Sequence, residues 1–312
     1  MAHVIALDVG GTGIKAALLD QAGQVVQPSW RPTGRERGPE AVVRGIIDFA
    51  ADLHREAAEA GHPVSAVGLA LPGIVDGAAG RGVHSATIGW RDAPFGDLLS
   101  ERTGLPTAVS HDVRAGGVAE ARLGAGRGQR RFLFVPVGTS IGAALMTDGQ
   151  AEPGAHNRAG EIGHLVVRPG GERCVCGAAG CAENYASAAA VERRYAAATG
   201  ERADPASIAR RAADGEPAAM AVWDEAVSVL ADTLLLCCTV VDPPLIVLGG
   251  GLAESGDLLL APLRARMSER AIVPVVPDLV RAQLGDRAGC LGAGLLAGDL
   301  HRAYKAGRGA EQ

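Results

Sequence analysis

Residues 9–18 (VGGTGIKAAL) and residues 137–145 (VGTSIGAAL) of this chain match once one glycine is skipped. Each stretch leaves an apolar run, passes through a turn with glycine and threonine and enters a second apolar run. Turns commonly recruit the same residues, so two unrelated hairpins are the alternative to a duplication. The match favours a duplicated domain, and it predicts that the two glycine turns face each other across a cleft.

The segments around both hairpins alternate between runs rich in Val, Ile and Leu and amphipathic stretches rich in Ala. This alternation is typical of an α/β protein. The expected strands are 4–9, 14–19, 64–71, 132–137, 141–147 and 245–248, and the expected helices are 39–60, 185–198, 218–240 and one that follows Gly289. Pro39 suits a first helical turn, and Gly61 suits a helix stop.

Composition limits the class of protein. The 312 residues are 47% hydrophobic and only 21% charged, which is enough apolar side chain for about two globular domains. A formal charge of −5 with scattered basic residues argues against nucleic acid as a partner. No apolar run reaches the roughly 20 residues that cross a bilayer, and a strand-like run begins within three residues of the start. We therefore expect a cytoplasmic protein with no membrane partner.

The first glycine turn has the groups that a nucleotide phosphate needs. Backbone N–H groups at Gly10 and Gly11 can approach phosphate oxygens because no Cβ intervenes, and Thr12 and Lys15 add a hydroxyl and an ammonium. Asp8 is suited to orienting hydrated Mg²⁺. The pattern is neither the dinucleotide fingerprint nor a Walker loop. A further glycine run over 249–251 follows an apolar strand, where it either admits the adenosine end of a nucleotide or forms an ordinary turn.

Three cysteines and a histidine have the spacing of a metal site. Cys174, Cys176 and Cys181 form C-x-C-x4-C, and His164 precedes the first of them by ten residues. Three thiolates and an imidazole fill all four positions of a tetrahedral Zn²⁺, so the ion would be structural. The alternative is a set of ordinary reduced thiols near a turn. The other cysteines lie in apolar stretches and are expected in the core: Cys237, Cys238 and Cys290.

These motifs, in this order, resemble the ROK family (repressors, open reading frames and kinases) of the actin-like ATPase superfamily, over essentially the whole chain. The matching segments are the first phosphate turn, the second turn at Gly138-Thr139, GEIGH at 160–164 and CVCGAAGCAE at 174–183. The resemblance implies two actin-like (ribonuclease H-like) α/β domains around a central cleft, with a zinc-stapled loop in the larger one. The implied domains are 1–111 with 292–312, and 112–291, in a homodimer.

The resemblance also implies transfer of the γ-phosphate of ATP, with Mg²⁺, to the 6-hydroxyl of a hexose. The family base is the Asp of an Asn-Asp pair, and the matching pair here is His111-Asp112. Without the flanking motifs, a helix N-cap would be the favoured interpretation of Asp112. The implied sugar ligands are Ser85, Thr87, His111, Asp112, Glu161, His164 and Glu183. The implied nucleotide ligands are Asp8, Gly10, Gly11, Thr12, Lys15, Gly138, Thr139, Gly249 and Gly250.

Two departures from the family pattern affect which sugar we expect the protein to prefer. His111 replaces an Asn, and the stretch 84–90 (HSATIGW) lacks another. A small Ser85 or Thr87 leaves room for a 2-substituent, which favours N-acetylglucosamine over glucose, with N-acetylmannosamine next. A non-catalytic sugar sensor is a distant alternative. ROK repressors carry an N-terminal DNA-binding module, for which three residues before the first strand leave no room.

Overall fold

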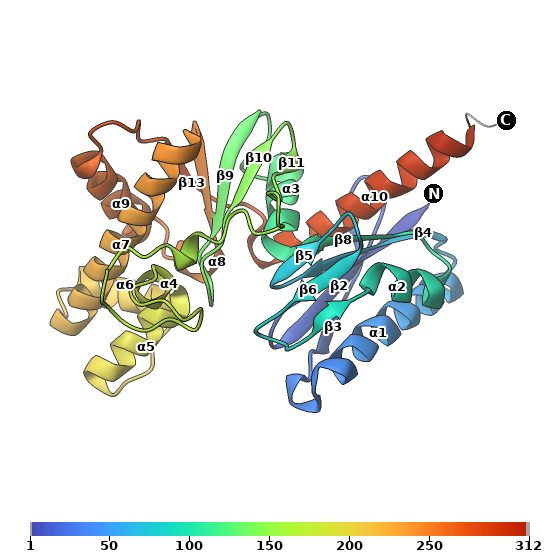
Figure 1. Ribbon diagram of the computed structural model, residues 1–312, viewed down its shortest axis with the longest axis horizontal. Coiled ribbons are helices and arrows are strands. Elements are labelled where there is room, and N and C mark those ends of the chain that lie inside the picture. The colour runs from blue at the N-terminus through green and yellow to red at the C-terminus, as the bar shows by residue number, and fades with distance from the viewer. Residues whose placement is uncertain (1, 310–312) are drawn as a thin grey trace. The chain divides into compact units, whose positions relative to one another are not determined.

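The computed structural model describes residues 2–309, with side chains described through residue 307 (Figure 1). The chain forms two compact units. Unit 1 contains the described residues up to Ala119, the segment Pro153–Arg158 and the described residues from Asp286 onward. Unit 2 contains Glu120–Glu152 and Ala159–Gly285.

Unit 1 holds two sheets, three α-helices and a short 3-10 helix. Its elements are β1 (His3–Val9), β2 (Gly13–Leu19), β3 (Val25–Pro32), η1 (Arg35–Arg37), α1 (Pro39–Glu59), β4 (Val64–Leu71), β5 (Ile74–Asp76), β6 (Arg81–His84), β7 (Arg91–Ala93), α2 (Phe95–Thr103), β8 (Thr107–His111) and α10 (Ala288–Gly309). Two elements cross the division between the units: α3 (Asp112–Leu123) and η3 (Gly285–Arg287).

Unit 2 holds one sheet with its helices. Its elements are β9 (Arg131–Pro136), β10 (Ala144–Thr147), β11 (Gln150–Ala151), η2 (Ile162–His164), α4 (Glu183–Ala186), α5 (Ala188–Thr199), α6 (Pro205–Ala213), α7 (Pro217–Val241), β12 (Leu245–Gly249), α8 (Gly250–Ala253), α9 (Asp257–Arg270) and β13 (Asp278–Arg281).

The two five-stranded sheets have the same topology, as the matching hairpins predict. Their orders are β3-β2-β1-β4-β8 and β11-β10-β9-β12-β13. In each sheet the first strand of the hairpin is the central strand, and it pairs antiparallel with the second strand of the hairpin and parallel with the strand on its other side. The glycine turns at 10–13 and 138–140 therefore occupy equivalent positions in the two sheets. The duplicated α/β architecture inferred from the sequence is confirmed.

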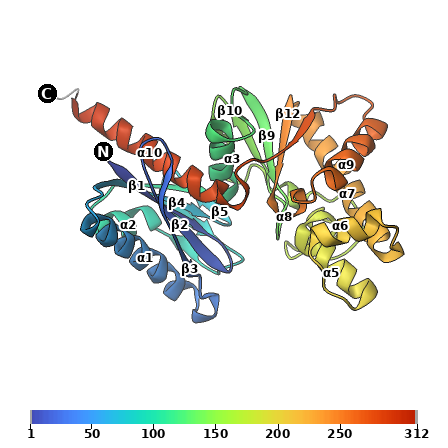
Figure 2. The same cartoon turned by 180° about the vertical axis from the view of Figure 1, so that it is seen from behind.

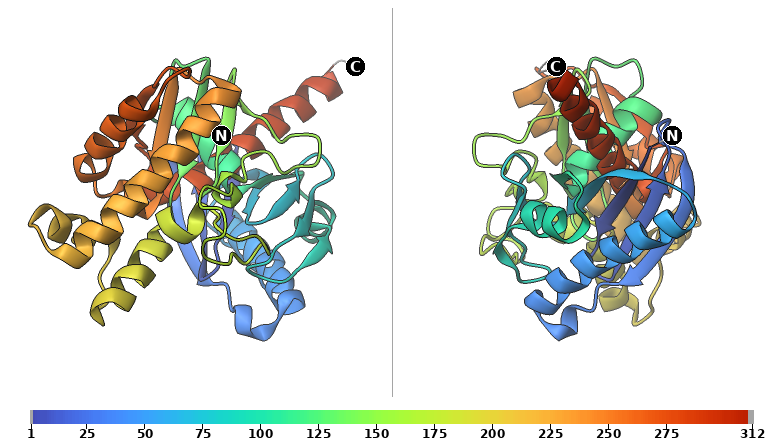
Figure 3. Two further views of the ribbon diagram at one scale, coloured as in Figure 1. Left: turned by 60° about the vertical axis from the view of Figure 1, so that its left-hand side comes forward. Right: turned by 90° about the vertical axis from the view of Figure 1, so that its right-hand side faces the viewer.

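The five-stranded sheet of unit 1 is covered by α1 on one face and by α10 on the other. Successive residues of β4 point to opposite faces, so they show which helix lies on each face. Val67 and Leu69 share a core with residues of α1. A Cβ at Gly68, on the other face, would overlap the backbone carbonyl of Ala293 in α10. Figure 2 shows α10 running along β1 and β4, and Figure 3 shows α1, in blue, beside the same sheet.

Helix α10 also meets the first turns of α3, at a contact that requires glycine. A Cβ at Gly292 would overlap the carbonyl oxygen of Ala115. This packing places the start of α3 and all of α10 in unit 1. The division in the structure accordingly falls inside α3 after Ala119 and before Asp286, whereas the boundaries drawn from the sequence are 111/112 and 291/292.

The substitution Gly292→Ala should therefore lower the melting temperature, because a backbone atom cannot yield to the added methyl group. Overpacking of this kind costs roughly 1–3 kcal/mol. The matched control is Gly298→Ala on the same helix, where the added Cβ meets only the Nη1 atom of Arg302 at 3.4 Å. That side chain can move, and the better helix propensity of Ala should keep or raise stability. Equal melting temperatures for the two variants would contradict the proposed α3–α10 contact.

One helix expected from the sequence is two helices in the structure. The range 185–198 is interrupted at Ser187, which adopts an extended conformation (φ −71°, ψ 156°) between α4 and α5. The Ser187 side chain accepts a hydrogen bond from the N–H of Ala190, 3.0 Å away, and so caps α5. Serine caps helices well because its oxygen satisfies an N–H that has no partner within the helix. The expected strand 141–147 is also shorter, since β10 begins at Ala144.

Candidate active site

The first glycine turn joins β1 to β2 in unit 1. The N–H of Gly10 donates to the carbonyl of Gly13 at 2.9 Å, so this N–H closes the turn. A Cβ at Gly11 would lie 3.1 Å from Cγ2 of Thr87, and a Cβ at Gly13 would overlap the indole of Trp30. The turn therefore needs glycine because side chains from two other segments approach its backbone. Thr12, also expected at the phosphate, is exposed.

Asp8 stands directly before this turn. A Cβ at Gly289, in the first turn of α10, would lie 2.6 Å from Oδ2 of Asp8, so the helix start closes over the carboxylate. Desolvation raises the pKa of Asp8 to about 7, the charge of Asp112 adds to the rise, and Lys15 opposes it. The ammonium of Lys15 lies 2.9 Å from both the carbonyl oxygen and Oδ2 of Asp286. Lys15 is thus already engaged by a carboxylate.

Asp112 lies where β8 ends and α3 begins. Its Oδ1 accepts a hydrogen bond from the N–H of Val113 at 2.7 Å and lies 3.2 Å from Nε2 of His111. An N-cap carboxylate bonds N–H groups two or three residues ahead, so this contact differs from a helix cap. The side chain is 34% exposed, which leaves it reachable by a ligand. Desolvation raises its pKa to about 6, against the lowering effects of the Val113 N–H and Arg114.

Arg114 is a site neighbour that the sequence analysis missed. Its side chain is buried, and Nη2 donates to the carbonyl of Val75 at 2.6 Å while Nη1 lies 3.4 Å from the carbonyl of Asn157. These bonds attach β5 and the segment Pro153–Arg158 to the helix that begins with Asp112. In the sequence, Arg114 is a single arginine among mostly small and apolar residues at the start of the helix, and this pattern does not show which groups it would bind.

Within the stretch 84–90, the two small residues expected at the sugar differ in their exposure to solvent. Ser85 is 1% exposed, and its Oγ accepts a hydrogen bond from the N–H of Ile88 at 3.3 Å. Thr87 is exposed and lies against Gly11 of the first glycine turn. Ser85 therefore shapes this loop, and Thr87 is the one of the pair that a ligand can reach.

In unit 2, the two glycines of GEIGH pack this motif against residues 141–143, which lie between the second turn and β10. Side chains at Gly160 and Gly163 would overlap the carbonyls of Ala143 and Ile141 respectively. The N–H of Ala143 donates to the Gly160 carbonyl at 2.8 Å, and the N–H of Gly163 donates to the Ile141 carbonyl at 3.1 Å. Glu161 is exposed at the start of η2, which ends at His164.

The two glycines where β12 ends and α8 begins pack against Val137, directly before the second turn. The N–H of Val137 donates to the Gly249 carbonyl at 2.8 Å. Gly250 has φ 77°, and a Cβ there would lie 2.5 Å from the Val137 carbonyl. Gly249 and Gly250 therefore contact the residue that directly precedes Gly138 and Thr139, the other two residues expected at the nucleotide in unit 2. In unit 1, Asp8 pairs with Lys15 across the hairpin that contains the 10–13 turn.

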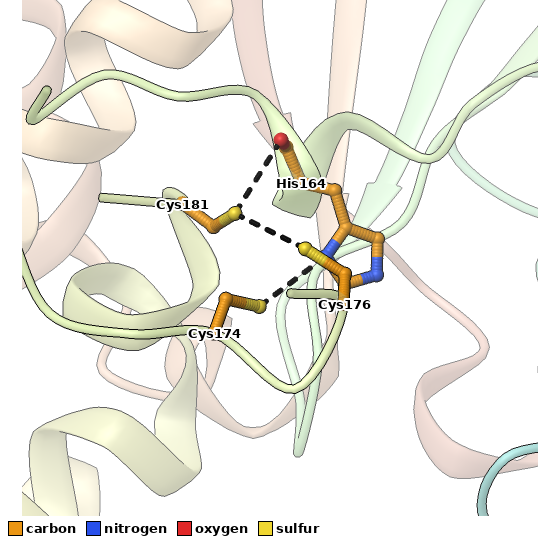
Figure 4. Close-up of side chains that lie close together, drawn as sticks. All are labelled: His164, Cys174, Cys176 and Cys181. Atoms are coloured by element: carbon orange, nitrogen blue, oxygen red, sulfur yellow. Dashed lines mark hydrogen bonds between the residues drawn. The ribbon is translucent and has the colours of Figure 1, made fainter. Parts of the chain in front are cut away.

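The cysteines and the histidine come together as their spacing predicts (Figure 4). One ligand atom from each of the four residues lies within 4.8 Å of all the others. Sγ of Cys176 lies 3.5 Å from Sγ of Cys181, and Sγ of Cys174 lies 3.6 Å from Nδ1 of His164. Tetrahedral zinc with Zn–S bonds of about 2.3 Å separates its sulfur ligands by about 3.8 Å, so the donor set fits this ion.

Glu183 lies at the edge of the same cluster. Its Oε1 is 3.2 Å from Sγ of Cys174 and 3.4 Å from Nδ1 of His164. The loop is held by glycines and backbone pairing, since a side chain at Gly180 would overlap the carbonyl of Arg168, and Val166 bridges to Cys181. Two of the expected sugar ligands, His164 and Glu183, are thus positioned by the cysteine loop.

Residues 4–299 match the ROK family model. The chain belongs to the ROK family. It is 32% identical to a glucokinase of Halalkalibacterium halodurans over 98% of each protein, and 30% identical to the N-acetylgalactosamine kinase AgaK of a Shewanella strain, covering 94% of this chain and 96% of that protein. A ROK family glucokinase from Streptomyces griseus, solved in complex with glucose and AMPPNP, is 30% identical with a TM-score of 0.80, covering 95% of this chain and 99% of the other.

These similarities confirm two predictions made from the sequence. The chain is a member of the ROK family, and it has the two-domain α/β fold of ROK kinases. Among residues 2–309, no helix is long and apolar enough to cross a membrane. Cys237, Cys238 and Cys290 are buried, as expected for core thiols.

Proposed function

We propose that this ROK protein is an ATP-dependent sugar kinase that transfers the γ-phosphoryl group to the 6-hydroxyl of a hexose. The observation that carries the proposal is the carboxylate of Asp112, which remains partly exposed at the end of β8 in the same unit as the glycine turn. A carboxylate within hydrogen-bond reach of the acceptor hydroxyl can take its proton as the new bond forms. The family membership supplies the reaction class.

In the proposed reaction, the sugar O6 attacks the γ-phosphorus and its proton passes to Asp112. The bond from the γ-phosphorus to the bridging oxygen breaks, and ADP leaves with that oxygen. The transition state is loose, so the protein mainly positions the acceptor and neutralises charge on the phosphoryl oxygens. Gly11, Thr12 and Asp8 would serve the phosphate and its Mg²⁺, and the turn at Gly138-Thr139 with Gly249-Gly250 would serve the rest of the nucleotide.

The cysteine cluster has a structural part in this proposal. Cys174, Cys176, Cys181 and Nδ1 of His164 would hold Zn²⁺, which leaves Nε2 of His164 for a sugar hydroxyl. Glu161 and Glu183 would accept further hydroxyl hydrogen bonds. Zinc supplies a rigid loop that orients these side chains, and the phosphoryl transfer itself is carried out by residues of the chain.

Glucose and N-acetylglucosamine are the first two of three candidate acceptors. Glucose is supported by the glucokinase relatives. The sequence favours N-acetylglucosamine because a small Ser85 or Thr87 would leave room for its 2-substituent. Since Ser85 is buried in its own loop, only Thr87 still supports this preference. The relative that acts on an N-acetylated amino sugar keeps this second candidate open. N-acetylmannosamine follows as a third, and a homodimer is expected for the assembly.

The test is ADP release with ATP and Mg²⁺ against glucose, mannose, N-acetylglucosamine, N-acetylmannosamine and N-acetylgalactosamine. We expect one acceptor to exceed the others by at least about tenfold in kcat/KM, because a pocket that pairs hydroxyls discriminates strongly. The reaction without sugar measures background ATP hydrolysis. Sugar binding without turnover for every acceptor would reject the kinase in favour of a sensor.

A further inference from the structure

The segment that follows β3 is fastened to the phosphate turn. The N–H of Thr33 donates to the carbonyl of Thr12 at 3.0 Å, and the Thr33 hydroxyl donates to the carbonyl of Gly10 at 2.6 Å. Thr33 is 1% exposed. Two hydrogen bonds from one buried residue hold the backbone at 33 in a constant relation to residues 10–12.

Gly34, in the left-handed backbone conformation, then turns the chain so that the side chain of Arg35 points back toward this turn. Gly34 has φ 67° and ψ 45°, a conformation that other residues rarely adopt, and η1 starts at Arg35. Nη1 of Arg35 lies 3.8 Å from the point where a Cβ of Gly11 would stand. Cγ2 of Thr87 lies 3.1 Å from the same point. The open side of Gly11 is therefore bordered by a guanidinium and by Thr87.

The neighbouring arginine in η1 behaves differently. Arg37 folds back onto its own segment, with Nε 3.4 Å from the Gly34 carbonyl and Nη2 3.4 Å from the Thr33 carbonyl. The carbonyl of Arg35 accepts a hydrogen bond from the N–H of Gly38 at 3.1 Å. Its guanidinium, by contrast, has neither a hydrogen bond nor an ion pair within the described part of the chain, and the side chain is exposed. Lys15, another cation of unit 1 beside the turn, is bound by Asp286. The guanidinium of Arg35 therefore remains free to bind an anion beside the turn.

We propose that Arg35 donates hydrogen bonds to the transferring phosphoryl group at the Gly10–Thr12 turn. The inference rests on the proposed kinase function and names a further catalytic residue for it. A planar guanidinium offers paired donors that match phosphate oxygens, and charge-assisted bonds of this kind are strong. In a loose phosphoryl transition state, charge spreads over the equatorial oxygens, where such a cation stabilises it.

The test compares Arg35→Ala, Arg35→Lys and the matched control Arg37→Ala in sugar phosphorylation. We expect Arg35→Ala to lower kcat by roughly 10- to 1000-fold, the range for removing one preformed donor to a transition state, with KM for the sugar nearly unchanged. Arg35→Lys should recover part of the loss because charge returns without the paired donors, and added guanidinium ion should partly rescue Arg35→Ala. Arg37→Ala should stay close to the unchanged protein.

If kcat of Arg35→Ala equals that of Arg37→Ala, the proposal is overturned. Melting temperatures of both variants should equal that of the unchanged protein, since both side chains are exposed. If the unchanged protein phosphorylates none of the sugars, the kinase assignment fails separately, and nucleotide binding then decides. In that case, Arg35→Ala must weaken binding of a non-hydrolysable ATP analogue relative to ADP, whereas an unchanged ratio rejects a role for Arg35 at the γ-phosphate.

Discussion

The substitution Asp112→Asn is expected to lower kcat for hexose phosphorylation by roughly 10²- to 10⁴-fold, the usual contribution of a positioned general base. Asn keeps the size of the side chain and can still face His111, but it cannot accept the proton of the attacking hydroxyl. Sugar binding measured by calorimetry should persist within a few-fold. ADP release with the best acceptor of the panel gives the rate.

The pH dependence gives an independent test of the same residue. Desolvation raises the pKa of Asp112 to about 6, and the base acts only when it is ionised. Activity should therefore fall as the pH drops below about 6, by roughly tenfold per unit. Measurement at saturating Mg²⁺ and ATP minimises the contribution of Asp8, whose pKa of about 7 in the free protein reflects mainly burial. A rate that stays flat from pH 8 to pH 5 would exclude Asp112 as the base.

The stability of Asp112→Asn separates loss of chemistry from loss of fold. A pKa raised in the folded state means that the fold favours the protonated form, so this contribution to stability is present below the ordinary value of 3.8 and is lost as the pH rises through about 6. At pH 8 the unchanged protein keeps a partly desolvated charge that Asn removes. The variant should therefore melt at the same temperature or higher at pH 8. A marked decrease would mean that Asp112 is structural.

Loss of the metal site should have the second large effect. The substitution Cys176→Ser is expected to reduce zinc content from about one ion per chain to near zero and to lower the melting temperature by roughly 5–10 °C, because a ligand that binds only the folded state stabilises it by mass action. Cys176 is exposed, so its replacement removes a ligand without opening a core cavity. Burial raises the pKa of Cys174 and Cys181, and a bound cation would displace their protons.

The matched control is Val175→Ser, in the same loop, where the side chain is 95% exposed and contributes no ligand. It should retain zinc and the melting temperature of the unchanged protein. A chelator added to the unchanged protein should reproduce the melting temperature of Cys176→Ser and reduce turnover, since His164 and Glu183 share the loop. Zinc-free preparations with full stability and activity would show that these are ordinary reduced thiols.

Sequence reasoning worked best where the requirement is local. The glycine turn at 10–13, the turn after β9 and C-x-C-x4-C each need certain atoms within a few consecutive residues, so their spacing alone indicates the chemistry. The hairpins of the two sheets were found for the same reason. The interruption at Ser187 was missed because helix propensity and helix capping compete at a single residue, and the side-chain bond to Ala190 decides between them.

The sequence by itself determined the family, the duplicated α/β plan, the two glycine turns and the cysteine–histidine cluster that could hold a metal ion. Only the tertiary structure decided the environments of the arginines, because their partners lie far away along the chain. The buried Arg114 side chain donates hydrogen bonds to carbonyls that lie 39 and 43 residues away along the chain. Arg35 lies beside Gly11 because hydrogen bonds from Thr33 hold its segment against the turn. Burial and free charge are properties of such long-range contacts, which residue type and spacing do not encode.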